Sequence, residues 1–174
     1  HLVLRRQRQM CIRDRYDVIL DSANLNGDEI VYDLYCGAGS ISLFLAKKAK
    51  FVYGFDIIVS SIENAEQNAV INNIQNIDFK VADLDSFFYT NKSNKYPSAD
   101  VVIVDPPRAG MHKKMTEYLP KIGAKKIIYV SCNPSTQARD SQILKSNNYK
   151  LEKLTVVDMF PHTPHVETVG VFKK

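Results

Sequence analysis

Cys132 stands in sequence surroundings that could make a thiol reactive. The stretch "YVSCNPST" places it at the end of an apolar run, directly before Asn133 and Pro134. Asparagine is a preferred N-cap and proline a preferred first helical residue, so a helix is predicted to begin here. The positive end of a helix dipole favours a thiolate. Although most buried cysteines are inert, this position at the end of a strand predicts a nucleophile.

A glycine-rich stretch, "DLYCGAGS", follows a predicted strand and opens a predicted helix. Gly37 and Gly39 permit backbone conformations, and a close approach of a ligand, that other residues do not. Ser42 stands where a dinucleotide-binding fingerprint has its third glycine. Asp56 follows Gly37 by about 20 residues, ends the next predicted strand and can accept hydrogen bonds from a ribose diol. NAD and S-adenosylmethionine (SAM) both carry that diol, and SAM is favoured because it has no pyrophosphate.

Other polar residues near this stretch have alternative explanations. Asp83 ends the third predicted strand, where it could meet an adenine amine or could cap a helix or turn. Asp33 could orient the glycine-rich loop or a cationic group. Cys36 lies inside the loop and is expected to pack beside the cofactor, without a catalytic role.

Asp105 opens the motif "DPPRAG" at the end of a nearly continuous apolar strand. The two prolines favour an extended, rigid loop. A DPP motif also suggests amino-group methyltransferases that act on adenine. In those enzymes an aromatic residue follows the prolines, whereas Arg108 follows them here, which weakens that interpretation. Arg108 could touch phosphate, stack on a base or form a surface ion pair.

Glu167, in "PHTPHVETV", is a candidate general base, although a carboxylate in a strand is more often a solvated side chain. His162 and His165 are too few to hold a metal ion without further ligands, so no metal is predicted. The three cysteines, Cys11, Cys36 and Cys132, show no CxxC spacing, which favours a reducing cytosol and a cytoplasmic protein. No apolar run approaches the roughly 20 residues that a membrane span needs.

The first 15 residues, "HLVLRRQRQMCIRDR", are set apart from the rest of the chain. They have no helical or strand period and resemble an adapter-derived scar, and the chain begins with His1. We therefore expect a fragment of a longer protein, with a folded domain over residues 16–174. The segment holds five arginines and one aspartate, which leaves 18 basic and 18 acidic residues in the domain. Charge alone therefore gives no evidence that this domain binds nucleic acid.

The elements that would position these residues alternate along the chain. Helices are predicted over 16–25, 40–49, 60–73, 113–119 and 134–146, with strands over 29–35, 51–57, 77–83, 99–105, 125–132, 149–160 and 165–174. Ser60 and Glu63 have capping-box spacing. Alternation of this kind predicts an α/β fold, a parallel sheet with helices on both faces. Ligands bind beyond the carboxyl ends of such strands, where Asp33, Asp56, Asp83, Asp105 and Cys132 would converge.

Four motifs together resemble one known family. "DLYCGAGSISLFLA", "DPPRAG", "YVSCNPSTQARD" and "DMFPHTPHVETV" occur in the order and spacing of the catalytic domain of bacterial RNA uracil-5 methyltransferases. These enzymes make 5-methyluridine in 23S rRNA or tRNA. The resemblance covers about Tyr16 to Lys174. It implies a Rossmann-like, SAM-dependent methyltransferase fold with a seven-stranded, mostly parallel sheet and an antiparallel closing strand.

The resemblance also implies roles for individual residues. Cys132 would be the nucleophile that adds to uracil C6, and Glu167 would be the base that removes the C5 proton. Asp105 would lie between the cofactor and the target base. The SAM pocket would be lined by Tyr35, Gly37, Gly39, Ser40, Asp56, Asp83 and Asp105.

The family's longer enzymes carry parts that this chain lacks. These include upstream RNA-binding modules and, in some members, an iron–sulfur cluster, for which this chain has no set of four cysteines. The expected partner is RNA, and the residues of the motifs "DLYCGAGSISLFLA" and "DPPRAG" favour 23S rRNA over tRNA. Two other functions remain open: an amino-methylating enzyme that uses the DPP motif, and a non-catalytic module that binds SAM or RNA.

Overall fold

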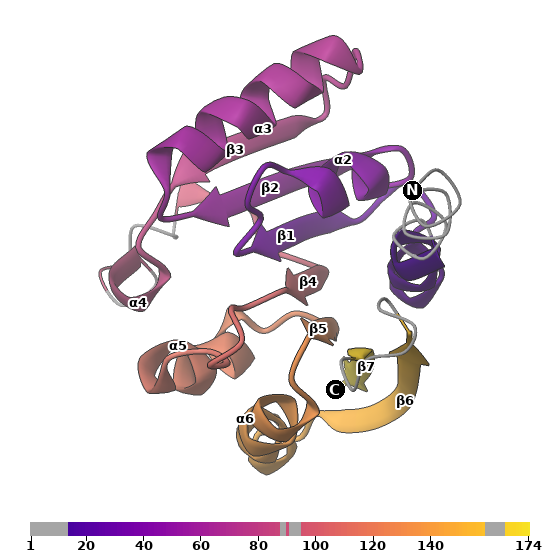
Figure 1. Ribbon diagram of the computed structural model, residues 1–174, viewed down its shortest axis with the longest axis vertical. Coiled ribbons are helices and arrows are strands. Elements are labelled where there is room, and N and C mark those ends of the chain that lie inside the picture. The colour runs from indigo at the N-terminus through magenta and orange to yellow at the C-terminus, as the bar shows by residue number, and fades with distance from the viewer. Residues whose placement is uncertain (1–13, 88–89, 91–94, 159–165) are drawn as a thin grey trace, which may run out of the picture.

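A computed structural model describes residues 14–87, 90, 95–158 and 166–174. Its centre is a seven-stranded sheet in the order β3-β2-β1-β4-β5-β7-β6 (Figure 1). The strands are β1 Ile30–Leu34, β2 Phe51–Asp56, β3 Ile77–Val81, β4 Val101–Val104, β5 Lys126–Ser131, β6 Lys150–Val157 and β7 Glu167–Lys173. The helices are residues 14–23, α2 Ser40–Ala46, α3 Val59–Ile71, α4 Leu84–Phe87, α5 Lys113–Tyr118 and α6 Pro134–Ser146, with a 3-10 turn over Leu119–Ile122.

Strand direction agrees with the predicted fold. The pairs β1–β2, β1–β4, β2–β3 and β4–β5 are parallel. Strand β7 runs antiparallel to β5 on one side and to β6 on the other. The prediction of a mostly parallel seven-stranded sheet with an antiparallel closing strand is therefore confirmed. Because β7 is reversed, its first residues lie at the edge of the sheet where β5 ends.

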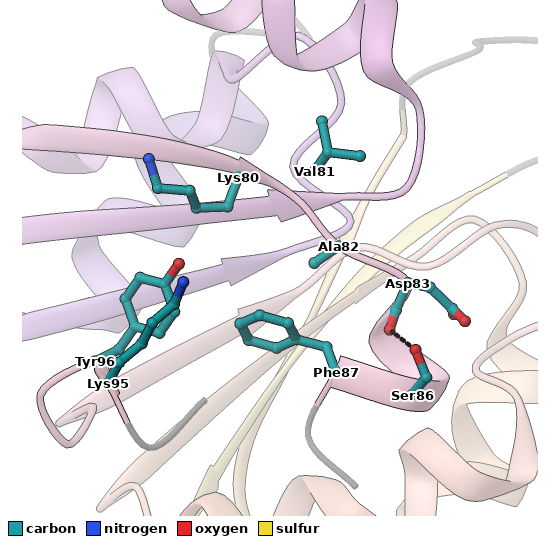
Figure 2. Close-up of a pocket in the computed structure, with 8 residues that line it drawn as sticks. All are labelled: Lys80, Val81, Ala82, Asp83, Ser86, Phe87, Lys95 and Tyr96. Atoms are coloured by element: carbon teal, nitrogen blue, oxygen red, sulfur yellow. Dashed lines mark hydrogen bonds between the residues drawn. The ribbon is translucent and has the colours of Figure 1, made fainter. Parts of the chain in front are cut away.

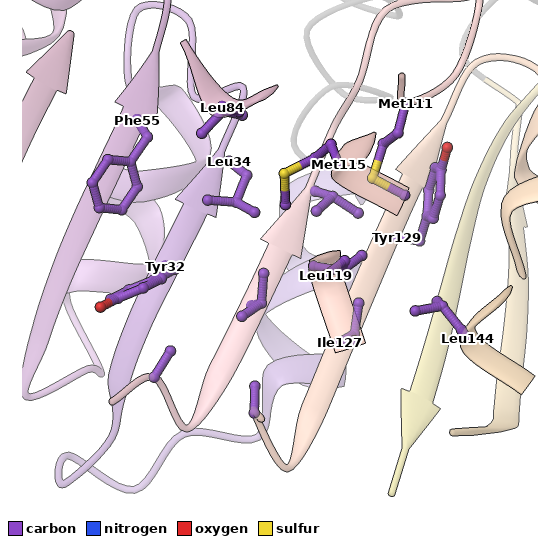
Figure 3. Packing of buried hydrophobic residues seen from close by; sticks show 14 of the residues in the cluster. Tyr32, Leu34, Phe55, Leu84, Met111, Met115, Leu119, Ile127, Tyr129 and Leu144 are labelled. Carbon is purple, nitrogen blue, oxygen red and sulfur yellow. The ribbon is translucent and has the colours of Figure 1, made fainter. Parts of the chain in front are cut away.

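Helices cover both faces of the sheet, as the alternating pattern predicts. On one face, Ile19 of the first helix and Leu45 of α2 pack on β1 and β4. On the other, residues of α4, α5 and α6 pack around Leu34 and Tyr129, as Figure 3 shows for Leu84, Met115 and Leu144. All four residues of β4 are buried, which explains its continuous apolar sequence. In the described ranges, no helix is long and apolar enough to cross a bilayer.

Two local predictions were wrong. The capping box of Ser60 and Glu63 does not form, because α3 begins earlier, at Val59, with Ile58 as its N-cap and no side-chain cap. The carboxylate of Asp56 instead accepts the Ile58 N–H at 2.9 Å. The first helix also begins no later than residue 14, so it includes two residues that sequence analysis assigned to the segment 1–15.

Candidate active site

The glycine-rich loop between β1 and α2 has the backbone that its sequence predicts. Gly37 and Gly39 adopt left-handed φ values of 54° and 79°. A Cβ on Gly39 would lie 2.6 Å from the ring of Phe79, so this glycine is required by close packing as well as by its φ. A Cβ on Gly37 would meet nothing within 4 Å. The loop is therefore packed on its inner side at Gly39 and open at Gly37, as a ligand-binding loop requires.

Asp56 lies at the end of β2, beside this loop. One carboxylate oxygen accepts the Gly37 N–H at 2.9 Å and the other accepts the Ile58 N–H at 2.9 Å. The side chain therefore fixes the glycine loop relative to the start of α3. Each carboxylate oxygen can accept more than one hydrogen bond, so lone pairs remain for a ribose diol.

Asp33 is fully buried under the loop, in β1. One of its oxygens accepts the hydroxyl of Ser42 in α2, and the other has no hydrogen-bond partner. Burial raises the pKa of Asp33 to about 7, although the Ser42 hydrogen bond opposes this rise. Ser42, which takes the place of a third glycine, therefore has a structural role that sequence analysis did not identify.

A pocket of about 220 Å³ opens at the carboxyl ends of the parallel strands. Its lining includes Tyr35 after β1, Ile57 after β2, Asp83 after β3 and Pro107 after β4. Sequence analysis assigned Tyr35 and Asp83 to the SAM pocket, and the structure brings them together here. Ser40, also assigned to that pocket, is exposed at the first position of α2.

A second pocket, of about 390 Å³, shares Asp83 with the first, and Figure 2 shows the residues that line it. Its lining includes Lys80 of β3, Phe87 of α4 and Tyr96. Asp83 thus stands between the two pockets. Its carboxylate accepts the Asp85 N–H at 3.2 Å, so Asp83 also has the turn-forming role that was its alternative explanation.

Cys132 is exposed in the turn between β5 and α6. Asn133 is the N-cap of α6, its side chain accepts the Ser135 N–H at 3.1 Å, and Pro134 is the first helical residue. The local structure predicted from "SCNP" is therefore confirmed. Cys36 differs, because it is buried and its burial raises the thiol pKa, with Asp33 and Asp56 adding to the rise. This environment keeps Cys36 a thiol and supports its assignment to a packing position.

Two carboxylates lie near the same point of this rim. The register between β5 and β7 ends with Ser131 paired to Thr168, and Cys132 and Glu167 each lie one residue beyond that pair at the same end of the two strands. One guanidinium nitrogen of Arg15 lies 3.6 Å from Asp105 and 3.7 Å from Glu167, so both acids converge on it. Burial raises the pKa of both carboxyls, and the positive charge of Arg15 opposes the rise in each.

Arg15 is the contact that sequence analysis missed, because it belongs to the segment that was set aside. No signal in the local sequence pointed to it, since its contacts come from elements far along the chain. His162 and His165, and also Cys11, lie outside the described residues. Across the part of the chain that is described, no three His, Cys, Asp or Glu side chains gather in a way that could hold a metal ion.

This sheet order, with a glycine-rich first loop and an acid ending the second strand, defines a Rossmann-like methyltransferase domain. The chain belongs to the tRNA (uracil-5-)-methyltransferase family, whose model matches residues 14–174. The predicted family and enzyme class, with SAM as the methyl donor, are therefore confirmed at the level of the family.

Individual relatives agree with this assignment. An uncharacterized RNA methyltransferase from Clostridium tetani is 48% identical over 154 residues, which are 88% of this chain and 33% of the relative. The crystal structure of the Pyrococcus abyssi tRNA (uracil-54, C5)-methyltransferase in complex with S-adenosyl-L-homocysteine aligns with a TM-score of 0.74 and 37% identity, over 91% of this chain and 38% of that one.

More distant structures share the fold alone. A precorrin-6y C5,15-methyltransferase from Geobacter metallireducens aligns with a TM-score of 0.73 at 14% identity, over 91% of this chain and 87% of that protein. The chain spans about a third of the length of the curated relatives that it matches.

Proposed function

We propose that this chain is the catalytic domain of an enzyme that methylates C5 of a uridine in RNA, with Cys132 as a covalent nucleophile. The observation that carries the proposal is that Cys132 directly follows β5, whose last residue, Ser131, pairs with Thr168, the neighbour of Glu167 at the start of β7. An exposed thiol at a helix N-terminus and a buried carboxylate at the same end of the sheet are a suitable pair of nucleophile and base. The buried Cys36 offers no such environment.

The proposed steps use these side chains as follows. The Cys132 thiolate forms a bond to uracil C6, and the electrons of the C5–C6 double bond move to give an enolate that activates C5. SAM, when bound, would supply the methyl group: the bond from C5 to the methyl carbon forms as the bond from that carbon to the sulfonium sulfur breaks, and S-adenosyl-L-homocysteine leaves. Glu167 then removes the C5 proton, the C5–C6 double bond re-forms, and the bond from sulfur to C6 breaks to release the thiolate. Burial raises the pKa of Glu167, which makes its carboxylate a stronger base.

The remaining residues of the rim would bind and orient the methyl donor. Gly37 leaves open space at the loop, and Asp56 has free lone pairs beside it for the ribose hydroxyls. Tyr35 and Asp83 line the adjoining pocket. Asp105 would stand between the donor and the target base, and its partly exposed carboxylate faces the same point as Glu167.

The RNA substrate is a further part of the proposal. The first candidate is 23S rRNA, because the residues of the glycine loop and of the motif "DPPRAG" favour it. The alternative is tRNA, because a relative of 37% identity is named as a tRNA (uracil-54, C5)-methyltransferase. The target base has to leave its stack to reach the site, which the RNA-binding part of a longer enzyme would assist. A cytoplasmic location fits such a substrate.

The experiment traps the covalent intermediate with 5-fluorouridine, because fluorine at C5 cannot leave as a proton. This chain, and in parallel a longer protein in which the rest of the relatives' length is restored, would be mixed with SAM and fluorinated 23S rRNA or tRNA fragments. Denaturing mass spectrometry should find a protein–RNA adduct mapped to Cys132. The RNA that forms it identifies the substrate.

Cys132→Ala should abolish this adduct and all turnover while SAM binding persists. The matched control is Cys36→Ala, which removes the second described cysteine and should still form the adduct. If the restored protein binds SAM but yields no adduct with either RNA, the cysteine mechanism is wrong. Methylation of an adenine amino group would then favour the alternative based on the DPP motif.

A further inference from the structure

The loop that carries Asp105 is attached to helix α6 by side chains of that helix. The side-chain amide of Asn133 donates to the Arg108 carbonyl at 3.2 Å. The guanidinium of Arg139 donates to the Ala109 carbonyl at 3.2 Å, and the carboxylate of Asp140 accepts the Met111 N–H at 3.0 Å. Three successive parts of the loop's backbone are thus bonded to one helix.

Asp140 is the centre of this attachment. It is 2% exposed, and its carboxylate accepts hydrogen bonds from three different donors. One oxygen accepts both the Met111 N–H and the Tyr129 hydroxyl, at 2.8 Å for the hydroxyl, while the other accepts the Arg139 Nε at 2.8 Å. A buried carboxylate is costly unless it is paired and hydrogen-bonded, and here both conditions hold.

The loop itself is shaped for this contact. Gly110 has a φ of 81°, and a Cβ there would lie 2.5 Å from the Arg139 guanidinium and 2.9 Å from the Asp140 carboxylate. Only glycine therefore lets the backbone come this close. The next residue, Met111, is buried beside Tyr129 in the core, as Figure 3 shows. Backbone and core packing thus hold the loop in a single place.

The bonds from Arg139 and Asp140 to the loop form a clamp between the loop and α6. The loop and α6 are the two parts of the chain that carry the proposed chemistry. The loop begins at Asp105, and α6 begins two residues after Cys132. We propose that Arg139 and Asp140 are positioning residues, which hold the loop on α6 so that Asp105 and Cys132 keep a fixed separation during catalysis. The clamp rests on the bonds above, and its role in catalysis rests on the proposed function.

The test is Arg139→Ala, because this side chain is 56% exposed and Asp140 keeps its bonds from the Met111 N–H and the Tyr129 hydroxyl in the variant. The matched control is Lys145→Ala, an exposed cation farther along α6. Hydrogen exchange of the amides of residues 109–111 should be about tenfold faster in Arg139→Ala than in the control. The affinity for SAM should stay within about twofold. In the restored protein, kcat and the rate of adduct formation should fall by about 10- to 100-fold, since small misplacements of reacting groups cost that much.

A second variant, Asp140→Asn, keeps an acceptor for Met111 and Tyr129 but loses the one for Arg139. If the two residues act as one clamp, the double variant of Arg139→Ala and Asp140→Asn should have the same kcat as the slower of the two single variants. Unchanged exchange in the loop would overturn the clamp. Faster exchange with an unchanged kcat would overturn the positioning role. A parent protein that forms no adduct would overturn the proposed function and this role with it, while the exchange comparison would still decide whether the clamp exists.

Discussion

Asp33 carries its carboxyl group into the closed interior beneath the glycine loop. Ser42 donates to one oxygen, and the other oxygen has no partner. The charges of Asp105 and Asp56, which act on it, are also negative and favour the protonated form. The group is therefore a buried acid whose proton stabilises the fold.

The pH dependence of stability should report this acid. Its pKa is raised from 3.8 in the unfolded chain to about 7 in the fold. Between these values the folded state binds more protons, so the free energy of unfolding decreases as pH rises through that window. Between pH 5 and pH 8 the decrease from Asp33 should be about 3 kcal/mol, since about two pKa units of that window lie above pH 5 and each is worth about 1.4 kcal/mol. Urea unfolding of the SAM-free protein at pH 5 and pH 8 would measure it.

Asp33→Asn should make this dependence flatter than in the parent. Asp105 and Glu167 also have raised pKa values and contribute with the same sign in both proteins, so the difference isolates Asp33. Ser42→Ala should move the fall in stability to higher pH, because it removes a hydrogen bond that lowers the pKa. Identical pH profiles for the parent and Asp33→Asn would contradict this account.

Sequence analysis predicted individual residues well where the signal was local. The adjacent residues Asn133 and Pro134 predict the start of α6, and the structure has Asn133 as the N-cap and Pro134 as the first helical residue. The partnership of Asp33 with Ser42, and of Asp140 with Met111, depends on how separate elements pack. Residue types suggested that Asp33 had a role, but only the fold reveals the bonds that a buried carboxyl makes.

At the scale of elements, Gly39 in the glycine loop is required for two separate reasons, its left-handed φ and its close packing against Phe79. Gly39 and Gly123 have the same φ of 79°, but their surroundings differ. A Cβ on Gly39 would overlap Phe79, whereas a Cβ on Gly123 would meet nothing closer than 3.9 Å. The pair therefore separates the cost of backbone conformation from the cost of packing.

Gly123→Ala should destabilise the fold by about 1–2 kcal/mol, the cost of a left-handed backbone for a residue with a Cβ. Gly39→Ala should cost about 1–3 kcal/mol more, because Phe79 has to move. Urea unfolding of both variants measures the difference. Equal losses would mean that the ring yields freely and that Gly39 is needed for its φ alone.

The elements themselves were largely predictable because the hydrophobic pattern and the helix boundaries are clear. Helix α6 has the predicted bounds, and β4 has its expected continuous apolar run. The start of α3 was misplaced, because Asp56 uses its carboxylate to hold Ile58 and so extends the helix by one residue. Strand order, with β7 between β5 and β6, does not follow from hydrophobic patterns, because period and burial do not encode which strands pair.

At the scale of the whole molecule, charge and length both bear on RNA binding. The domain from residue 16 onward has equal numbers of basic and acidic residues, and the chain spans about a third of its curated relatives. RNA affinity depends strongly on cations that neutralise phosphates. A catalytic domain without net positive charge is expected to rely on other parts of a longer enzyme for that affinity.

A chain that begins at residue 14, which keeps the first helix and Arg15, should still bind SAM but should bind RNA weakly. Its affinity for RNA should change by less than about tenfold between 50 and 200 mM salt, since proteins that contact 6–10 phosphates lose about 10³–10⁵. Filter binding at several salt concentrations measures the slope, with the restored longer protein as the comparison. Tight, strongly salt-dependent binding by the short chain would show that the domain carries its own RNA-binding surface.

The reversed strand β7 also affects the order in which the site forms during synthesis. A ribosome completes β5 and Cys132 well before it reaches Glu167. Until β7 inserts between β5 and β6, Cys132 lacks this carboxylate beside it. In the proposed mechanism, an adduct formed at that stage would have no base to release it. In the proposed mechanism, turnover would therefore require that β7 has already been inserted between β5 and β6.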